Sequence, residues 1–85
     1  MANLGTFEIN TNNEYVNLET LTGLTFTNGT SYTIQIQNTA FIREGTTGDG
    51  FIISDTKPFV LKYQGDDVYI RTPFFFPCTV NIATA

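Results

Sequence analysis

The stretch TNGTSYTIQIQ, residues 27–37, decides the fold class. Within it Tyr32, Ile34 and Ile36 stand at every second position, with threonine or glutamine between them. This period of two places the apolar side chains on one face of a β-strand, because successive side chains of a strand point to opposite sides. The Asn-Gly pair at 28–29 predicts a two-residue type I′ hairpin turn before this strand, since that turn needs positive φ at both central residues.

The same alternation recurs along the rest of the chain. It predicts strands at residues 6–10, 15–19, 24–27, 32–37, 40–44, 51–54, 59–64, 68–71 and 78–83, with a bend or bulge at 20–23. Asparagine, glycine, aspartate and proline separate these segments at intervals of roughly 8–12 residues, a spacing typical of sandwiches and barrels. We therefore predict an all-β fold in one domain over residues 1–85: a small antiparallel β-sandwich or jelly-roll-like barrel of about eight short strands.

The charge balance disfavours two classes of partner. The 85 residues include four Lys or Arg and eight Asp or Glu, which gives a net charge of −4. Arg43, Lys57, Lys62 and Arg71 are spaced too widely along the sequence to predict a basic patch. Binding to nucleic acid or to an anionic membrane surface requires clustered cations, so we expect neither.

Other features of the sequence bear on location and stability. No apolar run reaches the roughly 18 residues of a membrane-spanning helix, and residues 1–6 lack the pattern of a signal peptide, so we expect synthesis in a cytoplasm. The single cysteine, Cys78, cannot form an internal disulfide. A chain this short buries only about 60% of its unfolded surface, so without disulfide or metal it gains from self-association.

The sequence offers little material for catalysis or for cofactors. It contains no histidine, and Cys78 lies in an alternating segment that predicts a small buried side chain. Asp49, Asp66 and Asp67 lie in turns without the spaced ligands of a calcium loop. The glycines at 45, 48 and 50 are followed by neither Lys-Ser/Thr nor a helix, as a phosphate loop would require. We expect no enzymatic activity, no metal and no cofactor.

The run Phe74, Phe75 and Phe76, between two prolines, is the most unusual segment. Three consecutive side chains of a strand cannot all face one core, so at least one is exposed or buried elsewhere. The run forms either a loop that caps the core or a contact patch, because exposed aromatic clusters mark interfaces. Tyr15 and Tyr69 fall on the predicted outer face, so all five aromatic residues are candidates for an intersubunit or partner interface.

A resemblance covers residues 24–83. The segments 29–38 (GTSYTIQIQN), 41–45 (FIREG), 65–71 (GDDVYIR) and 80–83 (VNIA) follow one another in an order that resembles small β-sandwich proteins of tailed-phage virions, which serve as decoration, fibre or connector components. The resemblance departs at Phe74, Phe75 and Phe76, where a short polar hairpin is usual. It implies a structural subunit that assembles with its own copies, a trimer being favoured, and docks on a larger virion protein.

Two functions from different classes follow. The preferred one is a non-enzymatic structural subunit of a phage particle, made in the host cytoplasm and located in the virion as capsid decoration, head fibre or connector. Strand addition at open sheet edges is a second way for its copies to associate. The alternative is a carbohydrate-binding or adhesion module, because aromatic rings stack on sugar rings and amide groups bond to hydroxyls.

Overall fold

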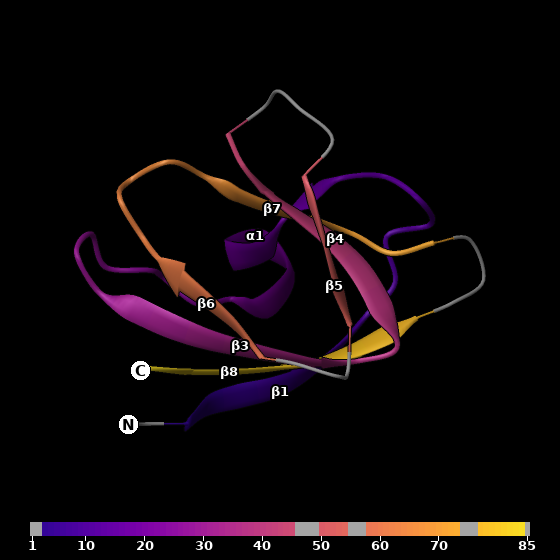
Figure 1. Ribbon diagram of the computed structural model, residues 1–85, viewed down its shortest axis with the longest axis horizontal. Coiled ribbons are helices and arrows are strands. Elements are labelled where there is room, and N and C mark those ends of the chain that lie inside the picture. The colour runs from indigo at the N-terminus through magenta and orange to yellow at the C-terminus, as the bar shows by residue number, and fades with distance from the viewer. Residues whose placement is uncertain (1–2, 46–49, 55–57, 74–76, 85) are drawn as a thin grey trace.

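The computed structural model describes residues 3–45, 50–54, 58–73 and 77–84 (Figure 1). Strands and one short helix follow one another in this order: β1 (Asn3–Ile9), β2 (Val16–Asn17), α1 (Leu18–Thr22), β3 (Ser31–Gln37), β4 (Thr39–Glu44), β5 (Phe51–Ser54), β6 (Phe59–Lys62), β7 (Val68–Arg71) and β8 (Cys78–Thr84). No helix in these ranges is long and apolar enough to cross a membrane.

The strands form two four-stranded antiparallel sheets packed face to face. One sheet has the order β1-β8-β3-β6 and the other has the order β2-β7-β4-β5. The chain pairs β1 with β8, β2 with β7, β3 with β6 and β4 with β5, and the pairs β8–β3 and β7–β4 join these into sheets. Rolling up one long antiparallel ribbon in this way gives a jelly roll. The predicted fold class is thereby confirmed.

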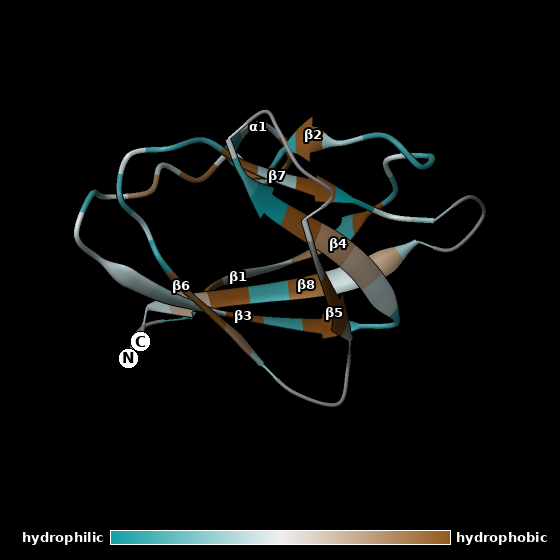
Figure 2. Ribbon diagram, turned by 45° about the horizontal axis from the view of Figure 1, so that its top comes forward, coloured by the Kyte–Doolittle hydropathy of each residue, from teal (hydrophilic) through white to brown (hydrophobic). Residues whose placement is uncertain are grey.

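The core lies between the two sheets and is built by the alternation seen in the sequence. Ile34 and Ile36 on β3, Val80 and Ile82 on β8, and Ile70 on β7 are each at most 2% exposed. Figure 2 shows the apolar and polar residues alternating along β4 and β8. Because each strand buries only one side, each sheet keeps an outer face, and these two outer faces are where ligands or partners can bind.

The strand predicted at residues 15–19 is wrong beyond Asn17. Residues Leu18–Thr22 form α1, which packs against β2 and β7 and buries Leu18 completely. The side chain of Asn17 accepts hydrogen bonds from the backbone N–H groups of Glu19 (2.8 Å) and Thr20 (3.2 Å), and Gly23 ends the helix with a φ of 75°. Asparagine at the N-cap and glycine after the last turn stabilise a short helix strongly enough to override the alternating pattern.

The strand predicted at residues 24–27 is also wrong. This segment is irregular because side chains take up its backbone donors: Phe26 N–H donates to Glu19 Oε2 (2.9 Å) and Thr27 N–H donates to the hydroxyl of Tyr32 (2.7 Å). Phe26 is nevertheless buried, with its ring centroid 4.7 Å from that of Tyr32. The alternation here therefore reports burial and not strand pairing.

The predicted type I′ hairpin at 28–29 is wrong as well. Thr30 N–H donates to the carbonyl of Thr27 (3.1 Å), so a turn does form. However, positive φ occurs at Gly29 (86°) and not at Asn28, which fits a type II turn. The turn delivers the chain from the irregular segment into β3, and Gly29 N–H bonds to the carbonyl of Tyr63 (2.8 Å) beyond the end of β6.

Candidate functional site

The outer face of the β2-β7-β4-β5 sheet gathers arginine and aromatic side chains. Two rows cross the strands: Ile52, Phe41 and Arg71 are register partners in one, and Arg43, Tyr69 and Asn17 in the next. The neighbouring residues Ala40, Ile42, Val68 and Ile70 point inward and are buried, which leaves the two rows on the outside. We call the following set the arginine–aromatic face: Tyr15, Phe41, Arg43, Ile52, Tyr69 and Arg71.

The guanidinium groups on this face stack on the rings. The Cζ atom of Arg43 lies 4.0 Å from the ring centroid of Tyr15 and 5.6 Å from that of Tyr69. The Cζ atom of Arg71 lies 3.9 Å from the ring centroid of Phe41 and 5.4 Å from that of Tyr15. Cation–π contacts at such distances contribute about 0.5–1 kcal/mol each when exposed and more when desolvated. The two arginines and three rings therefore hold each other in place before any partner arrives.

Two buried threonines anchor the loop that carries Tyr15. Thr11 N–H donates to Thr72 Oγ1 and Thr72 N–H donates to Thr11 Oγ1, both at 2.8 Å, although the two residues are 61 positions apart. Asn13 N–H donates to the carbonyl of Thr72 (2.8 Å), and Arg71 Nη1 donates to Asn13 Oδ1. These bonds tie the loop after β1 to the end of β7 and so set Tyr15 over the arginines.

Gly50 packs closely against the hydroxyl of Tyr15. A Cβ atom built on Gly50 would lie 2.7 Å from the Tyr15 hydroxyl, 2.6 Å from the carbonyl oxygen of Ile42 and 3.1 Å from the Cβ atom of Arg43. Its φ of 76° is also one that residues with side chains rarely adopt. A residue with a side chain at position 50 would therefore disturb the packing of this face.

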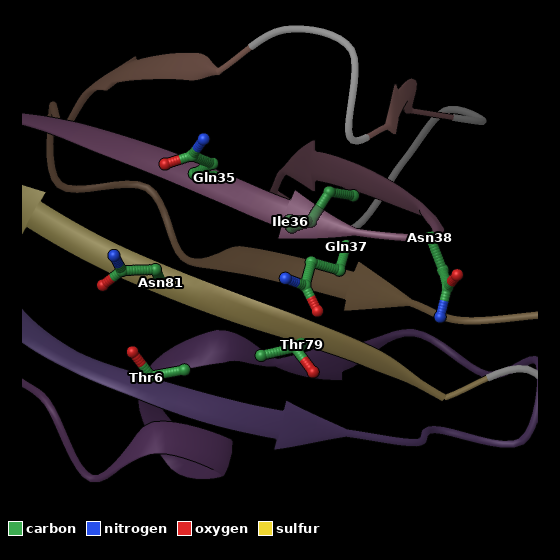
Figure 3. A pocket seen from close by; sticks show the side chains of 7 residues that line it. All are labelled: Thr6, Gln35, Ile36, Gln37, Asn38, Thr79 and Asn81. Atoms are coloured by element: carbon green, nitrogen blue, oxygen red, sulfur yellow. The ribbon is translucent and has the colours of Figure 1, made fainter.

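The outer face of the β1-β8-β3-β6 sheet has a different character. It is hollowed into a groove of about 620 Å³, which we call the amide groove; its lining residues are Thr6, Gln35, Ile36, Gln37, Asn38, Thr79 and Asn81 (Figure 3). Thr6, Asn81 and Gln35 are register partners across β1, β8 and β3, and Thr79 and Gln37 are partners in the next row. The lining therefore presents amides and hydroxyls and carries no charged side chain.

One atom of the amide groove is left without a partner. Asn81 Oδ1 is buried and has no hydrogen-bond partner among the described residues. At the end of the groove, Asn38 has a φ of 75° and its Nδ2 donates to the carbonyl of Pro77 (3.0 Å). The bond fixes the position of the Asn38 side chain.

The structure describes two of the five aromatic residues that the sequence predicted as interface candidates. Tyr15 and Tyr69 lie on the same outer face, as expected, and both contact Arg43. Phe74, Phe75 and Phe76 lie outside the described residues. The wide spacing of the cations along the sequence did not show that Arg43 and Arg71 lie close together in space, where both stack on the Tyr15 ring. Sequence reasoning also missed Phe41, although its place between inward-pointing Ala40 and Ile42 gave the signal.

The remaining chemical candidates are inert or dispersed. Cys78 is 1% exposed, as predicted, and burial raises the pKa of its thiol to about 11. A thiol with that pKa stays protonated at neutral pH, which makes it a poor nucleophile. Asp66 and Asp67 are exposed, Asp49 lies outside the described residues, and among the residues described no group of three or more His, Cys, Asp or Glu could hold a metal ion.

In the comparisons with known proteins, no family model, curated protein or solved structure matches this chain.

Proposed function

We propose that this chain is a non-enzymatic assembly module that docks on protein partners through its arginine–aromatic face. The observation that carries the proposal is the stacking of Arg43 and Arg71 on Tyr15 and Phe41 across one sheet face. Arginine and tyrosine are among the residues that dominate binding energy at protein interfaces. Here they are already ordered, so a partner need not supply the entropy of fixing them.

The edge of this face adds an apolar contact. Ile52 on edge strand β5 is 68% exposed, and it is the register partner of Phe41. A patch with apolar and aromatic residues beside two guanidinium groups suits a partner surface that offers carboxylates around an apolar centre.

Charge favours association between unlike surfaces of two copies. If this face packed against the same face of a second copy, Arg43 and Arg71 of both copies would oppose each other. The chain carries eight carboxylates against four cations, so the acidic exterior of a neighbouring copy is the better complement. Such a head-to-tail contact between unlike surfaces forms a ring when the rotation between copies closes and a filament when it does not, and a trimer is the smallest such ring.

The resemblance to tailed-phage virion proteins supports a more specific proposal. In it the ring is a capsid decoration, head fibre or connector, and it docks on a larger virion protein. Jelly rolls recur in viral capsid domains, which is an analogy of architecture and gives no evidence on its own about the site.

Native mass spectrometry and light scattering at micromolar concentration test the proposal. Ile52→Ser and Arg71→Gln should each raise the dissociation constant of the oligomer at least tenfold, about 1.4 kcal/mol. Val60→Ser is the matched control, because Val60 is 60% exposed on β6, an edge strand of the other sheet. A wild-type chain that stays monomeric and captures no capsid or tail protein refutes the proposal, as does equal weakening by Val60→Ser.

A further inference from the structure

The amide groove lies on the opposite sheet from the arginine–aromatic face, and the assembly function leaves it unused. We infer that this groove is a binding site for a neutral saccharide, held by hydrogen bonds from amide and hydroxyl side chains on β1, β8 and β3. The side chains of Thr6, Asn81 and Gln35 form one row across these strands, beside the row of Thr79 and Gln37 (Figure 3).

The position of the groove within the sheet restricts what can bind there. β8, the middle strand of the groove, pairs with β1 on one side and with β3 on the other, so its backbone groups are already used in the sheet. A peptide strand can be added only at an open edge, where backbone donors and acceptors are available. A ligand that lies over β8 must therefore bind to side chains.

The chemistry of those side chains selects the class of ligand. Gln35, Gln37 and Asn81 each carry an amide, which both donates and accepts hydrogen bonds, and Thr6 and Thr79 carry hydroxyls that do the same. A sugar hydroxyl is likewise both donor and acceptor. The lining has no charge to balance an ionic ligand, although Glu8, the register partner of Thr79, borders it with a further acceptor.

The spacing of the side chains favours a ligand with many hydroxyls. Neighbouring strands lie about 4.8 Å apart, and side chains on one face of a strand recur about every 6.8 Å. The groove thus presents a regular lattice of polar groups, and an extended chain of sugar units can bond to several of them at once.

The unpartnered Oδ1 of Asn81 is the second observation that points to a ligand. A buried acceptor without a donor destabilises the folded protein, and native structures hold few of them. The atom belongs to the row formed by Thr6, Asn81 and Gln35. Because Oδ1 is buried, the Asn81 side chain would have to rotate to bring this atom to the groove surface, where a hydroxyl of a bound sugar would donate to it.

The probes are neutral glycans, first on an array and then as soluble hexamers of glucose, galactose, mannose and N-acetylglucosamine at millimolar concentration. NMR spectroscopy follows the side-chain NH₂ signals of the protein. At least one hexamer should shift the signals of Gln35, Gln37 and Asn81 and leave Gln64, which is exposed outside the groove, unchanged. No binding on the array and no shift with any hexamer would overturn the inference.

Two variants separate a binding site from a surface that is merely polar. Gln35→Leu should weaken binding about tenfold, whereas Gln64→Leu, the same change at an exposed position outside the groove, should leave it unchanged. Asn81→Leu should abolish binding and leave the melting temperature equal to or above that of the wild type, because it removes the orphaned acceptor. A drop of several degrees in Asn81→Leu, or equal binding by Gln35→Leu and wild type, contradicts the inference.

Discussion

Replacing Gly50 by alanine tests how tightly the arginine–aromatic face is built. The new Cβ atom would lie 2.6 Å from the carbonyl oxygen of Ile42 and 2.7 Å from the hydroxyl of Tyr15. The carbonyl belongs to β4, which is paired on both sides within its sheet and cannot move away. The substitution must therefore distort the start of β5, displace Tyr15 from Arg43, or both.

Gly45 provides a control with almost the same backbone. Its φ is 78° against 76° for Gly50, but a Cβ atom on Gly45 would meet nothing within 4 Å. Both alanines should carry the cost of a left-handed conformation, about 1–2 kcal/mol. Only the alanine at 50 adds the cost of overpacking, about 1–3 kcal/mol. The free energy of unfolding should thus fall by about 2–5 kcal/mol for Gly50→Ala and by about 1–2 kcal/mol for Gly45→Ala.

Thermal unfolding followed by far-UV circular dichroism measures the difference. In a domain of this size 1 kcal/mol shifts the melting temperature by about 4–8 °C, so Gly50→Ala should melt at least about 5 °C below Gly45→Ala. Near-UV circular dichroism, which has no tryptophan signal here, should also report a changed tyrosine environment in Gly50→Ala alone. Equal melting temperatures for the two variants would refute the close packing of Gly50 under Tyr15.

Three further predictions concern the core and its caps. Because the folded state raises the pKa of Cys78 from 9.0 to about 11, its contribution to stability is complete below pH 9 and is lost as pH rises to 11. The loss is about 2 kcal/mol by pH 11, and urea unfolding from pH 8 to 11 should show it in the wild type but not in Cys78→Val. Thr72→Val should cost about 1–3 kcal/mol in urea unfolding, since it leaves the buried N–H of Thr11 without an acceptor; a cost below about 0.5 kcal/mol would contradict the anchoring role. Asn17→Ala should cost about 1 kcal/mol through loss of the α1 cap, and an unchanged urea midpoint would contradict it.

Alternation predicted the strands well where a strand buries one face. The ranges expected at 51–54 and 68–71 match β5 and β7, because their inward residues are apolar and glycine or aspartate bounds them. The pattern failed at 15–27, where each departure has a local cause. Asn17 and Gly23 cap a helix, and Glu19 and Tyr32 bind backbone donors that a strand would have used. Alternation reports which residues are buried, and only hydrogen bonding decides whether the backbone is a strand.

The candidate sites were harder to predict, because they depend on register between distant strands. The sequence placed Tyr69 on an outer face, but it could not show that Arg43 and Tyr69 are register partners. The amide groove needs Thr6 beside Asn81, residues from opposite ends of the chain. Such pairings follow from the jelly-roll winding, in which the first strand meets the last. No short motif in the sequence encodes them.

Because Arg43 and Arg71 lie close together, the prediction that this protein does not bind nucleic acid needs an argument other than the spacing of its cations. Spacing along the sequence is a poor guide to distance in space. Arg43 and Arg71 both stack on Tyr15, although β5 and β6 lie between their strands, β4 and β7, in the sequence. The number of cations is the stronger argument. Binding to a phosphate backbone gains affinity for each phosphate that a Lys or Arg side chain neutralises. A face with two guanidinium groups on a chain of net charge −4 can neutralise about two phosphates, so we still expect no binding to nucleic acid. Two cations stacked on three rings instead suit recognition of one or two carboxylates beside an apolar centre, which is why we propose a protein partner.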